Sequence, residues 1–537
     1  MKTERRGLFL VVTVLILSAL LGGVYGPSVR ATQSAYDELQ GSVESFARVL
    51  DVVQANYAEP VDVDRIVYRG AVPGMLRVLD PHSSFFDADE WAFDQEVRQG
   101  KYYGVGMTIM SRGQHTAVTT PYEGSPAFKV GIRPGDRILT IDDKSVENMT
   151  TLQVSELLRG ARGTAVTIKI SREGYSDPLV FTLTRDEIPR HAVELAFDIK
   201  PGVGYIKLSG FNESTDRELS SAMKQLDSSS LDGLVLDMRG NPGGLLNEAI
   251  AVADRFLDKN QLIVSSRGRV SAERRYYAIR GNQGDTMPLV LLVNNDSASA
   301  TEIVTGAIQD HDRGVVVGET TYGKGLVQIH EPLSENTGLA LTIARYYTPS
   351  GRLIQRDYKS VSLYAYHYER KVPEYPTEIR ETDSGRKVTG GGGIHPDIVV
   401  PEADLNHFQK TLLRANVFFP YENSVGGFTL HYLGTRPVIT KDFEVDEAVV
   451  SDFRQFLTAE NIPCTPAELG ENLDWVKRKI KQEIFLSTFG QQESLKVELE
   501  ADPQVIASIE AVPQARALYE SARKILAERE GTTTYRP

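Results

Sequence analysis

The stretch 288–328, PLVLLVNNDSASATEIVTGAIQDHDRGVVVGETTYGKGLVQ, constrains the fold of this chain more than any other segment. It begins with an apolar run, Leu289 to Val293, which predicts a buried strand. A polar turn that carries Ser299 follows, and apolar residues then recur at helical spacing over 303–308. A second apolar run, Val315 to Val317, predicts another short strand. The rest of the chain is organised around this strand–turn–helix–strand segment.

Ser299 and Lys324 are the two residues of this segment that could carry chemistry. A serine at a strand-to-helix turn can lie exposed beside free helix N-terminal N–H groups, where an acyl-transfer nucleophile is needed. Serine is a weak nucleophile and requires a base, and a lysine serves only if its pKa falls far below the ~10.4 of the free side chain. Lys324, between Gly323 and Gly325, is therefore a candidate base. Taken alone the pair is weak evidence, because serine-rich turns and glycine-flanked lysines are usually solvated.

The complete string SASATEI, QD, GVVVGE, YGKG and Gln328 resembles the active-site segment of the carboxyl-terminal processing peptidases, also called tail-specific proteases. That family uses a Ser-Lys catalytic pair. The resemblance implies that Ser299 is the nucleophile, Lys324 the general base and Gln328 the amide that orients the lysine. It also implies supporting roles for Glu302 and Asp310, although helix capping and surface polarity explain these two residues equally well.

Ser297 is the rival nucleophile, and only the register of the motif favours Ser299.

A further motif, LDGLVLDMRGNPGGLLNEAI at Leu231 to Ile250, predicts a buried strand, a glycine-rich turn and a helix. It lacks the Walker lysine and the G-x-G-x-x-G spacing of a phosphate loop. It resembles instead the family's oxyanion-hole strand, with the donor N–H on Gly244 beside Gly243. The N–H of Ser299 or Ala300 would be the second donor.

Residues 101–187 look like a PDZ domain, since both its carboxylate-binding loop and its central segment, Gly124 to Asp143, have counterparts here. Successive backbone N–H groups in a glycine-bearing loop can hold a C-terminal carboxylate while the peptide adds as a β-strand. Apolar residues at 105, 107 and 109 would favour apolar C-termini. The carboxylate-binding residues implied are Tyr103, Gly104, Val105, Gly106 and Met107.

Arg159, in the stretch LLRGARG, resembles a residue that in some relatives links peptide occupancy of the PDZ groove to assembly of the active site. We therefore expect it to gate the protease. The alternative is a solvated cation at a helix end that interacts with the last carbonyls.

Composition agrees with a large enzyme and excludes other classes. The chain has 537 residues, 41% of them hydrophobic, enough for several packed domains. A net charge of −13 argues against a nucleic-acid partner. A single cysteine, Cys464, excludes an internal disulfide framework. The nine histidines show no metal-site spacing, so we expect neither a metal nor another cofactor.

The N-terminus has the pattern of an export signal. Basic residues, Arg5 and Arg6 among them, precede an apolar stretch from Leu8 to Leu21, which has signal-peptide length. Val29 and Ala31 form an acceptable cleavage site, whereas extension of the apolar stretch through Val24 would leave a tilted membrane anchor. We expect an extracytoplasmic protein of the periplasm or cell envelope, either secreted or anchored by this segment.

Two segments downstream of this signal are predicted to be helical. Apolar residues from Leu39 to Val53 recur at three- and four-residue intervals, which predicts an amphipathic helix. The following GAVPGMLRVLDPHSSFF, Gly70 to Phe86, resembles the family's N-terminal helical segment. His82 and Ser83 within it suggest a catalytic pair, but a capping or turn role is the stronger expectation.

We therefore expect an α/β multidomain serine endopeptidase: a crotonase-like protease core, a name taken from the resemblance, with an inserted PDZ domain and helical N- and C-terminal parts. A catalytically inactive PDZ scaffold and an apolar-ligand-binding protein on the same core are the alternatives. The expected partners are protein or peptide substrates with apolar C-termini, with an adaptor protein and a second copy of the chain as further candidates. The expected divisions are a signal or anchor over 1–31, a helical region over 36–98, the PDZ domain over 99–187, the protease core over 188–402 and a helical extension over 405–537.

Overall fold

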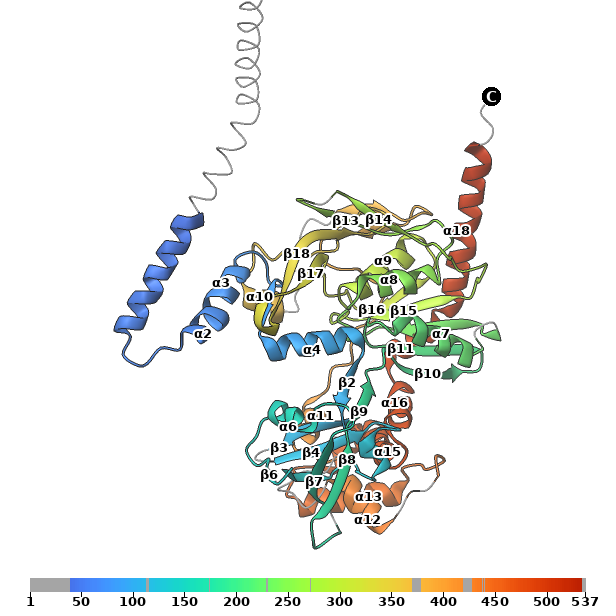
Figure 1. Cartoon of the computed structure of the whole chain (residues 1–537). Coiled ribbons are helices and arrows are strands. Elements are labelled where there is room, and N and C mark those ends of the chain that lie inside the picture. Colours follow the sequence, from blue (N-terminus) through green and yellow to red (C-terminus); the bar gives the residue numbers. More distant parts are fainter. Residues whose placement is uncertain are drawn as a thin grey trace, which may run out of the picture. The chain divides into compact units, whose positions relative to one another are not determined.

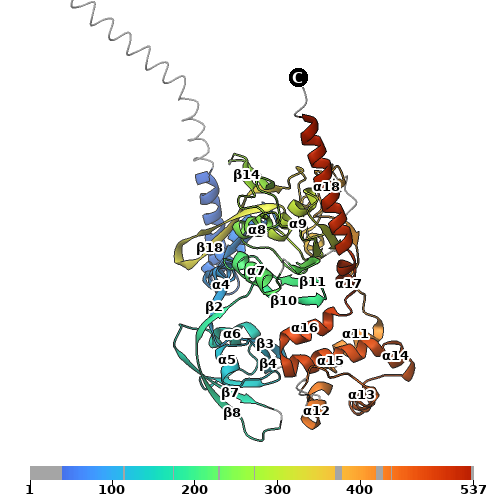
Figure 2. The same ribbon diagram turned by 90° about the vertical axis from the view of Figure 1, so that its right-hand side faces the viewer.

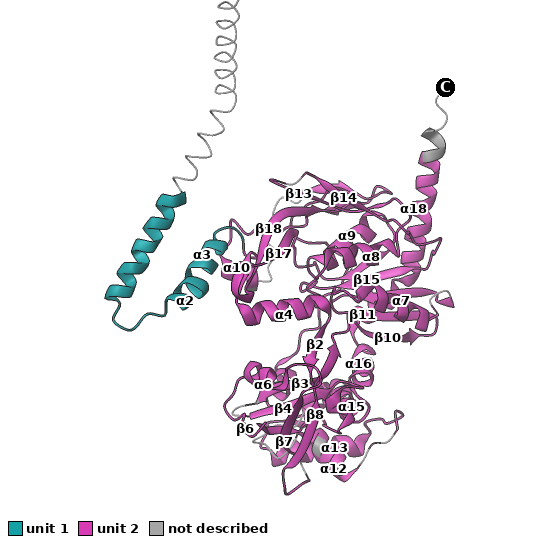
Figure 3. Ribbon diagram, viewed as in Figure 1, with its two compact units in different colours: residues 1–80 teal, residues 81–537 magenta. Residues whose placement is uncertain are grey.

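The computed structural model describes residues 39–112, 115–172, 174–227, 230–270, 272–368, 378–418, 427–436, 438 and 440–533. The chain divides into two compact units, Met1–Asp80 and Pro81–Pro537, which are described separately (Figure 3). The predicted signal or anchor over residues 1–31 lies outside the described residues. In the first unit a helix spans residues 39–56, and three short segments follow: α2 (Val63–Ile66), the π-helix η1 (Val67–Ala71) and α3 (Val72–Arg77).

The second unit is built on a six-stranded sheet in the order β10-β11-β12-β15-β16-β21 (Figure 1). All neighbouring strands are parallel except β10 and β11. Every residue of β12 and β15 is buried, as expected for a parallel sheet covered on both faces. The strands are β10 (Val193–Lys200), β11 (Val203–Leu208), β12 (Gly233–Asp237), β15 (Leu289–Val293), β16 (Val315–Gly318) and β21 (Ile398–Val399).

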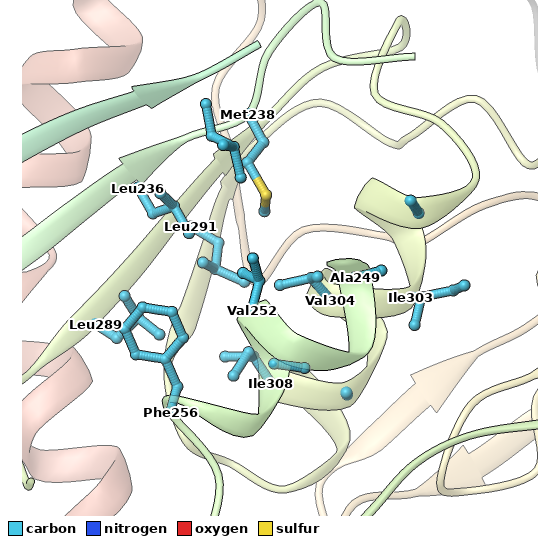
Figure 4. Close-up of a cluster of buried hydrophobic side chains, with 14 of the residues drawn as sticks. Leu236, Met238, Ala249, Val252, Phe256, Leu289, Leu291, Ile303, Val304 and Ile308 are labelled. Atoms are coloured by element: carbon cyan, nitrogen blue, oxygen red, sulfur yellow. The ribbon is translucent and has the colours of Figure 1, made fainter. Parts of the chain in front are cut away.

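Different helices cover the two faces of this sheet. Leu289 and Leu291 of β15 pack in a cluster with α8 (Leu246–Asp254) and α9 (Ala300–Asp310), as Figure 4 shows. The alternate residues Val290 and Leu292 pack in a second cluster with residues of α17 and α18. The elements that contribute to these clusters include α7 (Thr215–Gln225), α17 (Pro503–Glu510) and α18 (Val512–Thr533). The predicted C-terminal extension therefore supplies one side of the core.

A second, antiparallel sheet has the order β1-β18-β13-β14, with β17 also paired to β18. Strand β17 begins immediately after the predicted Lys324 loop. The strands are β1 (Ser84–Phe86), β13 (Leu262–Gly268), β14 (Arg274–Tyr277), β17 (Leu326–Pro332) and β18 (Gly338–Tyr347). Smaller elements nearby in the sequence are η3 (Ser334–Asn336), α10 (Leu363–Tyr368) and the hairpin of β19 (Ile379–Glu381) and β20 (Lys387–Thr389).

The predicted PDZ region forms a sheet of its own in the order β3-β4-β5-β7-β8, with β6 paired to β5. The chain leads into this region through β2 (Lys101–Gly104) and out of it through β9 (Asp186–Pro189). These two strands pair with each other. Helix α4 (Ala88–Gln99) precedes β2 and begins with a capping box formed by Asp87 and Glu90. The remaining elements are β3 (Met107–Arg112), β4 (His115–Pro121), α5 (Pro126–Lys129), β5 (Arg137–Ile141), β6 (Lys144–Ser145), α6 (Thr151–Leu158), β7 (Ala165–Ser171) and β8 (Leu179–Thr184).

The chain beyond residue 405 is helical. Its first helices share a separate hydrophobic cluster that includes Phe428, Phe453 and Ile480. Figure 2 shows α17 and α18 continuing from these helices to the core sheet. The helices of the cluster region are α11 (His407–Arg414), α12 (Phe428–Thr435), α13 (Glu447–Ala459), α14 (Pro466–Glu471), α15 (Leu473–Phe489) and α16 (Gln491–Leu499).

Candidate active site

Ser299 lies at the sharp turn between β15 and α9. Its φ of 55° and ψ of −111° place a non-glycine residue in a sparsely populated backbone region. Such a conformation persists only where surrounding contacts hold it, and it is concentrated at functional sites. The neighbouring Ala298 and Ala300 are buried, whereas Ser299 is only partly buried. The turn thus presents one serine at the start of a helix, as the sequence pattern predicts.

Ser297, the rival nucleophile, is fully buried, and its hydroxyl has two hydrogen-bond partners. Its hydroxyl donates to the Met238 carbonyl oxygen at 2.8 Å and accepts from the Asn294 N–H at 3.0 Å. It therefore joins the Ser299 turn to the loop after β12. This gives a structural reason for the presence of Ser297, independent of the motif register.

The Lys324 loop is joined to the Ser299 turn by Glu302, whose side chain is buried within α9. One carboxylate oxygen, Oε2, accepts from the Ser299 N–H at 2.8 Å and from the Lys324 N–H at 2.8 Å. Because both bonds end on one oxygen, the two nitrogens can be no farther apart than the sum of the bond lengths, 5.6 Å. The Tyr322 N–H also donates to the Ser297 carbonyl oxygen at 2.9 Å. The backbones of the two predicted catalytic residues are thus held side by side.

The second oxygen of Glu302, Oε1, accepts from the Thr321 hydroxyl at 2.6 Å and from the Gly323 N–H at 2.7 Å. Burial raises the pKa of Glu302, and these four donors counteract that effect by stabilising the carboxylate. Helix capping, one of the two explanations weighed for this residue, describes only its bond to Ser299. The bonds to Thr321, Gly323 and Lys324 cross to another loop and order it.

The glycine loop after β12 approaches the same turn. A Cβ atom at Gly243, which has a φ of 99°, would lie 2.8 Å from both the Ala300 nitrogen and the Ser299 Cβ. Any side chain there would collide with the start of α9. The Ser299 N–H is already bonded to Glu302, whereas within the described part of the chain neither the Ala300 nor the Gly244 N–H has an acceptor. Of the two donors expected from the sequence, Ser299 or Ala300, only the Ala300 N–H is therefore without an acceptor among the described residues.

Gln328 lies on β17, four residues beyond Lys324. Its Nε2 donates to the His82 carbonyl oxygen at 2.6 Å. The His82 imidazole in turn lies 2.9 Å from the Tyr366 hydroxyl, and the Ser83 hydroxyl accepts from the Thr342 N–H at 3.1 Å. His82 and Ser83 therefore make the structural contacts of a turn, and His82 also fixes the amide of Gln328.

Asp310, at the other end of α9, is buried against Arg352. Its carboxylate also accepts from the Ser350 N–H at 2.9 Å, and its carbonyl oxygen accepts from the Asp383 N–H at 2.9 Å. These contacts tie the C-terminal end of α9 to two later loops. Asp310 is thus not a surface residue, and its contacts support the helix that carries Ser299.

Two known protein families match parts of this chain. The profile of "Peptidase family S41" matches residues 202–362 and that of "PDZ domain" matches residues 117–172. The chain is 37% identical over 356 residues to the carboxy-terminal-processing protease of Bartonella bacilliformis, a match that covers 65% of this chain and 80% of that protein. The chain belongs to the carboxy-terminal processing protease family. Its members are serine peptidases, and this chain is an enzyme of that class.

Two further relatives illustrate the range of the family. The carboxy-terminal processing protease CtpA of Bacillus subtilis is 30% identical over 360 residues, covering 66% of this chain and 76% of that protein. Among solved structures, the photosystem II D1 C-terminal processing protease is 30% identical, with a TM-score of 0.35, and the match covers 64% of this chain and 84% of that one. The peptidase and PDZ families together imply that the protease acts on peptides or proteins.

The predicted carboxylate-binding residues of the protease, 103–107, span the end of β2 and the start of β3. Tyr103 pairs with Glu187 and is 40% exposed, whereas Val105 and Met107 are buried in the PDZ core. Gly106 has a φ of 76°, and its carbonyl oxygen accepts from the Ser125 hydroxyl at 2.8 Å. Strand β3 is an edge strand of its sheet and has α6 beside it. An extended peptide could therefore add to β3.

Arg159 lies at the C-terminal end of α6 and contacts the segment that leads into the protease core. It forms an ion pair with Glu96 of α4, and its guanidinium lies 5.0 Å from the ring centre of Tyr102. Arg190 lies over the same ring at 5.2 Å. Arg159 thus joins α6 to α4 and β2. A solvated cation at a helix end would make only local contacts.

The sequence reasoning missed one polar group of the protease, at the end of β12. Asp237 and Arg239 flank Met238 in the motif DMRGNPGG, and both are largely buried. Two adjacent signals were available: charged residues at the end of an otherwise apolar strand, and the glycine loop that follows them. Among the described residues no cluster of metal-ligating side chains is present, and no helix there is long and apolar enough to span a bilayer.

Proposed function

We propose that the protein is an exported Ser-Lys endopeptidase with a crotonase-like core, which binds the C-terminal tails of its substrates through its PDZ domain. Ser299 is the nucleophile, Lys324 the general base, and Gln328 the group that orients the lysine. The N–H groups of Gly244 and Ala300 stabilise the oxyanion. The observation that carries this proposal is the pair of bonds from Ser299 and Lys324 to one oxygen of Glu302.

The reaction follows from these roles. Neutral Lys324 accepts the hydroxyl proton of Ser299 as its Oγ attacks the scissile carbonyl carbon. The resulting oxyanion receives hydrogen bonds from the two N–H groups, and loss of one such donor typically costs about 10²–10³ in rate. The C–N bond then breaks as the lysine ammonium returns its proton to the departing amine. Water, deprotonated by Lys324, hydrolyses the acyl-enzyme and frees Ser299.

Glu302 and Asp310 act as positioning residues in this scheme. Glu302 sets the distance between the two catalytic backbones and fixes the loop that carries Lys324. Asp310 and Arg352 hold the far end of α9. The basic and apolar N-terminal segment directs export and supplies membrane contact, which places the protease in the cell envelope. An adaptor protein and a second copy of the chain are its further candidate partners.

The proposal is tested by four variants on an unfolded protein substrate with an apolar C-terminus. Ser299→Ala, Lys324→Ala and Lys324→Arg should each lower kcat by about 10⁴-fold or more, since they remove the nucleophile or the proton acceptor. Ser297→Ala should retain cleavage, because its hydroxyl is not the proposed nucleophile, while losing about 1–3 kcal/mol of stability, because it leaves buried partners unsatisfied. Wild-type cleavage by Ser299→Ala would refute the assignment of Ser299 as the nucleophile.

A further inference from the structure

Arg239 links the glycine loop of the active site to the C-terminal extension. It lies two residues beyond the end of β12 and four residues before Gly243. Its Nη1 donates to Asp502 at 2.6 Å and to the Gln504 side-chain oxygen at 2.8 Å. Both partners lie at the start of α17, 263 and 265 residues away in sequence. Asp237, Arg239, Asp502 and Gln504 are called the Arg239 cluster below.

The inner side of the Arg239 cluster is anchored in the core sheet. The Asp237 carboxylate is fully buried and accepts from the Arg239 Nη2 at 2.7 Å and from the Tyr205 hydroxyl at 2.7 Å. Lys207 donates to the carbonyl oxygen of Arg239 at 2.7 Å and to Asp237 at 3.2 Å. Burial alone would raise the pKa of Asp237, but the charges of Lys207 and Arg239 hold it at about 2. The Asp237 carboxylate therefore stays ionised and provides Arg239 with a buried, negatively charged partner.

Asp502 and Gln504, which form the other side of the Arg239 cluster, are also held by further hydrogen bonds. Asp502 uses its other oxygen, Oδ1, to accept from the N–H groups of Gln504 at 2.8 Å and Val505 at 3.2 Å, so it also caps α17. The Gln504 amide donates to the Val400 carbonyl oxygen at 2.7 Å, and the residue is buried. Close packing accompanies these bonds, since a Cβ atom at Gly233 would lie 2.4 Å from a methyl group of Val512 in α18.

Residues on both sides of Arg239 in the sequence contact the Ser299 turn. The Met238 carbonyl oxygen accepts from the Ser297 hydroxyl at 2.8 Å, and the Asn241 carbonyl oxygen accepts from the Ala298 N–H at 2.9 Å. Asn241 also accepts, through its side-chain oxygen, from the Gly243 N–H at 2.9 Å. A displacement of Arg239 would therefore be passed to the glycine loop and to the serine turn together.

We propose that Asp502 and Gln504 of the C-terminal extension are positioning residues for catalysis, which hold Arg239 and thereby the Gly243–Gly244 loop in its reactive geometry. The inference rests on the proposed function, because it assigns the loop to oxyanion binding. It gives the extension a role in turnover. A misplacement of about 1 Å in such a site costs up to about 100-fold in rate.

Asp502→Asn is the sharpest test, because asparagine caps a helix as well as aspartate does but places an amide or a neutral oxygen against Arg239. We expect kcat to fall about 10- to 100-fold with little change in KM for the tailed substrate. Arg516→Ala is the matched control. Arg516 lies on α18 of the same extension, is half exposed and pairs with Asp232 at 3.7 Å, so its removal should leave turnover unchanged.

A double-mutant cycle separates positioning from general stability. If Asp502 acts through Arg239, Asp502→Asn should have no further effect on kcat in an Arg239→Ala background. Hydrogen exchange over residues 238–244 should also speed up in Asp502→Asn, whereas exchange in β12 should not. This second readout requires no activity.

Wild-type kcat in Asp502→Asn, or additive effects in the cycle, would overturn the inference. Equal losses in Asp502→Asn and Arg516→Ala would overturn it too, because they would indicate a general effect of the extension. Ser299→Ala keeps the two proposals distinguishable. An inactive Ser299→Ala together with a fully active Asp502→Asn would reject only the role of the extension, whereas an active Ser299→Ala would reject the proposed function itself.

Discussion

At the scale of single residues, Glu302 has more effect on the site than its place in the motif suggests. Its two oxygens accept four hydrogen bonds, two from backbone groups of the predicted catalytic residues and two from the Lys324 loop. A carboxylate can accept at both oxygens, whereas a carboxamide has one acceptor end and one donor end. A glutamate at this position therefore satisfies all four donors, whereas a glutamine would not.

The first residue-scale prediction concerns Glu302→Gln. The amide nitrogen would face two donors, leaving them unsatisfied at a cost of about 1–3 kcal/mol each. Because the loop would shift, we expect kcat to fall about 100-fold, with a smaller change in KM. Steady-state kinetics and urea unfolding measure the two effects.

Glu248→Gln is the matched control for this prediction. Glu248 also lies on a helix of the core and accepts from a single backbone N–H, that of Asp216, at 2.9 Å. Its amide can keep that bond through the remaining oxygen, so activity should be retained. Equal kinetics in the two glutamine variants would show that Glu302 has no particular role in the site.

At the scale of elements, α9 is fixed at both ends by buried polar groups. Its N-terminus carries Ser299 and Glu302, and its C-terminus is followed by His311, whose side chain is 7% exposed. The two ring nitrogens of His311 lie 2.7 Å from an Asp383 carboxylate oxygen and 2.7 Å from the Leu262 carbonyl oxygen. Both partners are acceptors, so the doubly protonated ring satisfies both bonds. A cation there also complements the helix dipole.

This arrangement makes the stability of α9 dependent on pH. Burial lowers the pKa of His311, but the hydrogen bond and charge of Asp383 outweigh it, and the net pKa is raised. A histidine whose folded pKa exceeds the unfolded value of about 6.5 contributes stability that is fully present below that value. The contribution is lost as the pH rises through the folded pKa.

We therefore expect wild type to be more stable than His311→Gln by about 1.5–3 kcal/mol near pH 6, with a difference that shrinks as the pH rises. Urea unfolding at several pH values measures it. His191→Gln is the control: the pKa of His191 is also raised, by Glu218, but its side chain is 62% exposed and should contribute less. A difference between wild type and His311→Gln that did not vary with pH would exclude the charged histidine.

At the scale of the whole molecule, a continuous set of contacts runs from α6 of the PDZ domain to β17 of the core. Arg159 pairs with Glu96 on α4, and Trp91 of the same helix stacks on His330 of β17. His330 also lies 3.1 Å from Asp94 of α4 and is two residues from Gln328. Helix α4 therefore contacts both the PDZ domain and the strand that carries the proposed lysine-orienting residue. Contacts alone do not transmit a signal, so coupling requires a functional test.

The whole-molecule prediction is that Arg159→Ala lowers kcat for large tailed substrates, about tenfold, without changing the affinity of the PDZ domain for a C-terminal peptide. The physical reason is that the groove remains while its link to α4 is lost. A charge reversal, Arg159→Glu with Glu96→Arg, should restore part of the loss. Peptide titration and kinetics on the same preparations measure both quantities.

Arg162→Ala provides the control for Arg159. Arg162 lies in the same stretch, is 66% exposed and pairs with Asp186 at 2.8 Å, so it shares the local charge without the contact to α4. Its turnover should equal that of wild type. Unchanged turnover in Arg159→Ala would leave that residue with only a structural role at the end of α6.

The sequence by itself determined the local pattern of the site and the family. The apolar run of β15, the serine turn and the helical spacing after it are short-range features, which residues close in sequence encode through burial and periodicity. The register of the motif singled out Ser299, Lys324 and Gln328, and the all-apolar strands indicated a sheet covered on both faces. The family assignment from these motifs is confirmed by the relatives.

Only the tertiary structure decided which distant groups meet. It brought Glu302 into contact with both the Ser299 turn and the Lys324 loop, where Glu302 accepts the hydrogen bond of the Ser299 N–H. It also brought Arg239 to Asp502, 263 residues away. It also showed that the C-terminal helices form one covering layer of the core sheet. Local patterns cannot specify such pairings, because each depends on the path of the whole chain and on which of many similar polar residues that path brings within hydrogen-bond distance.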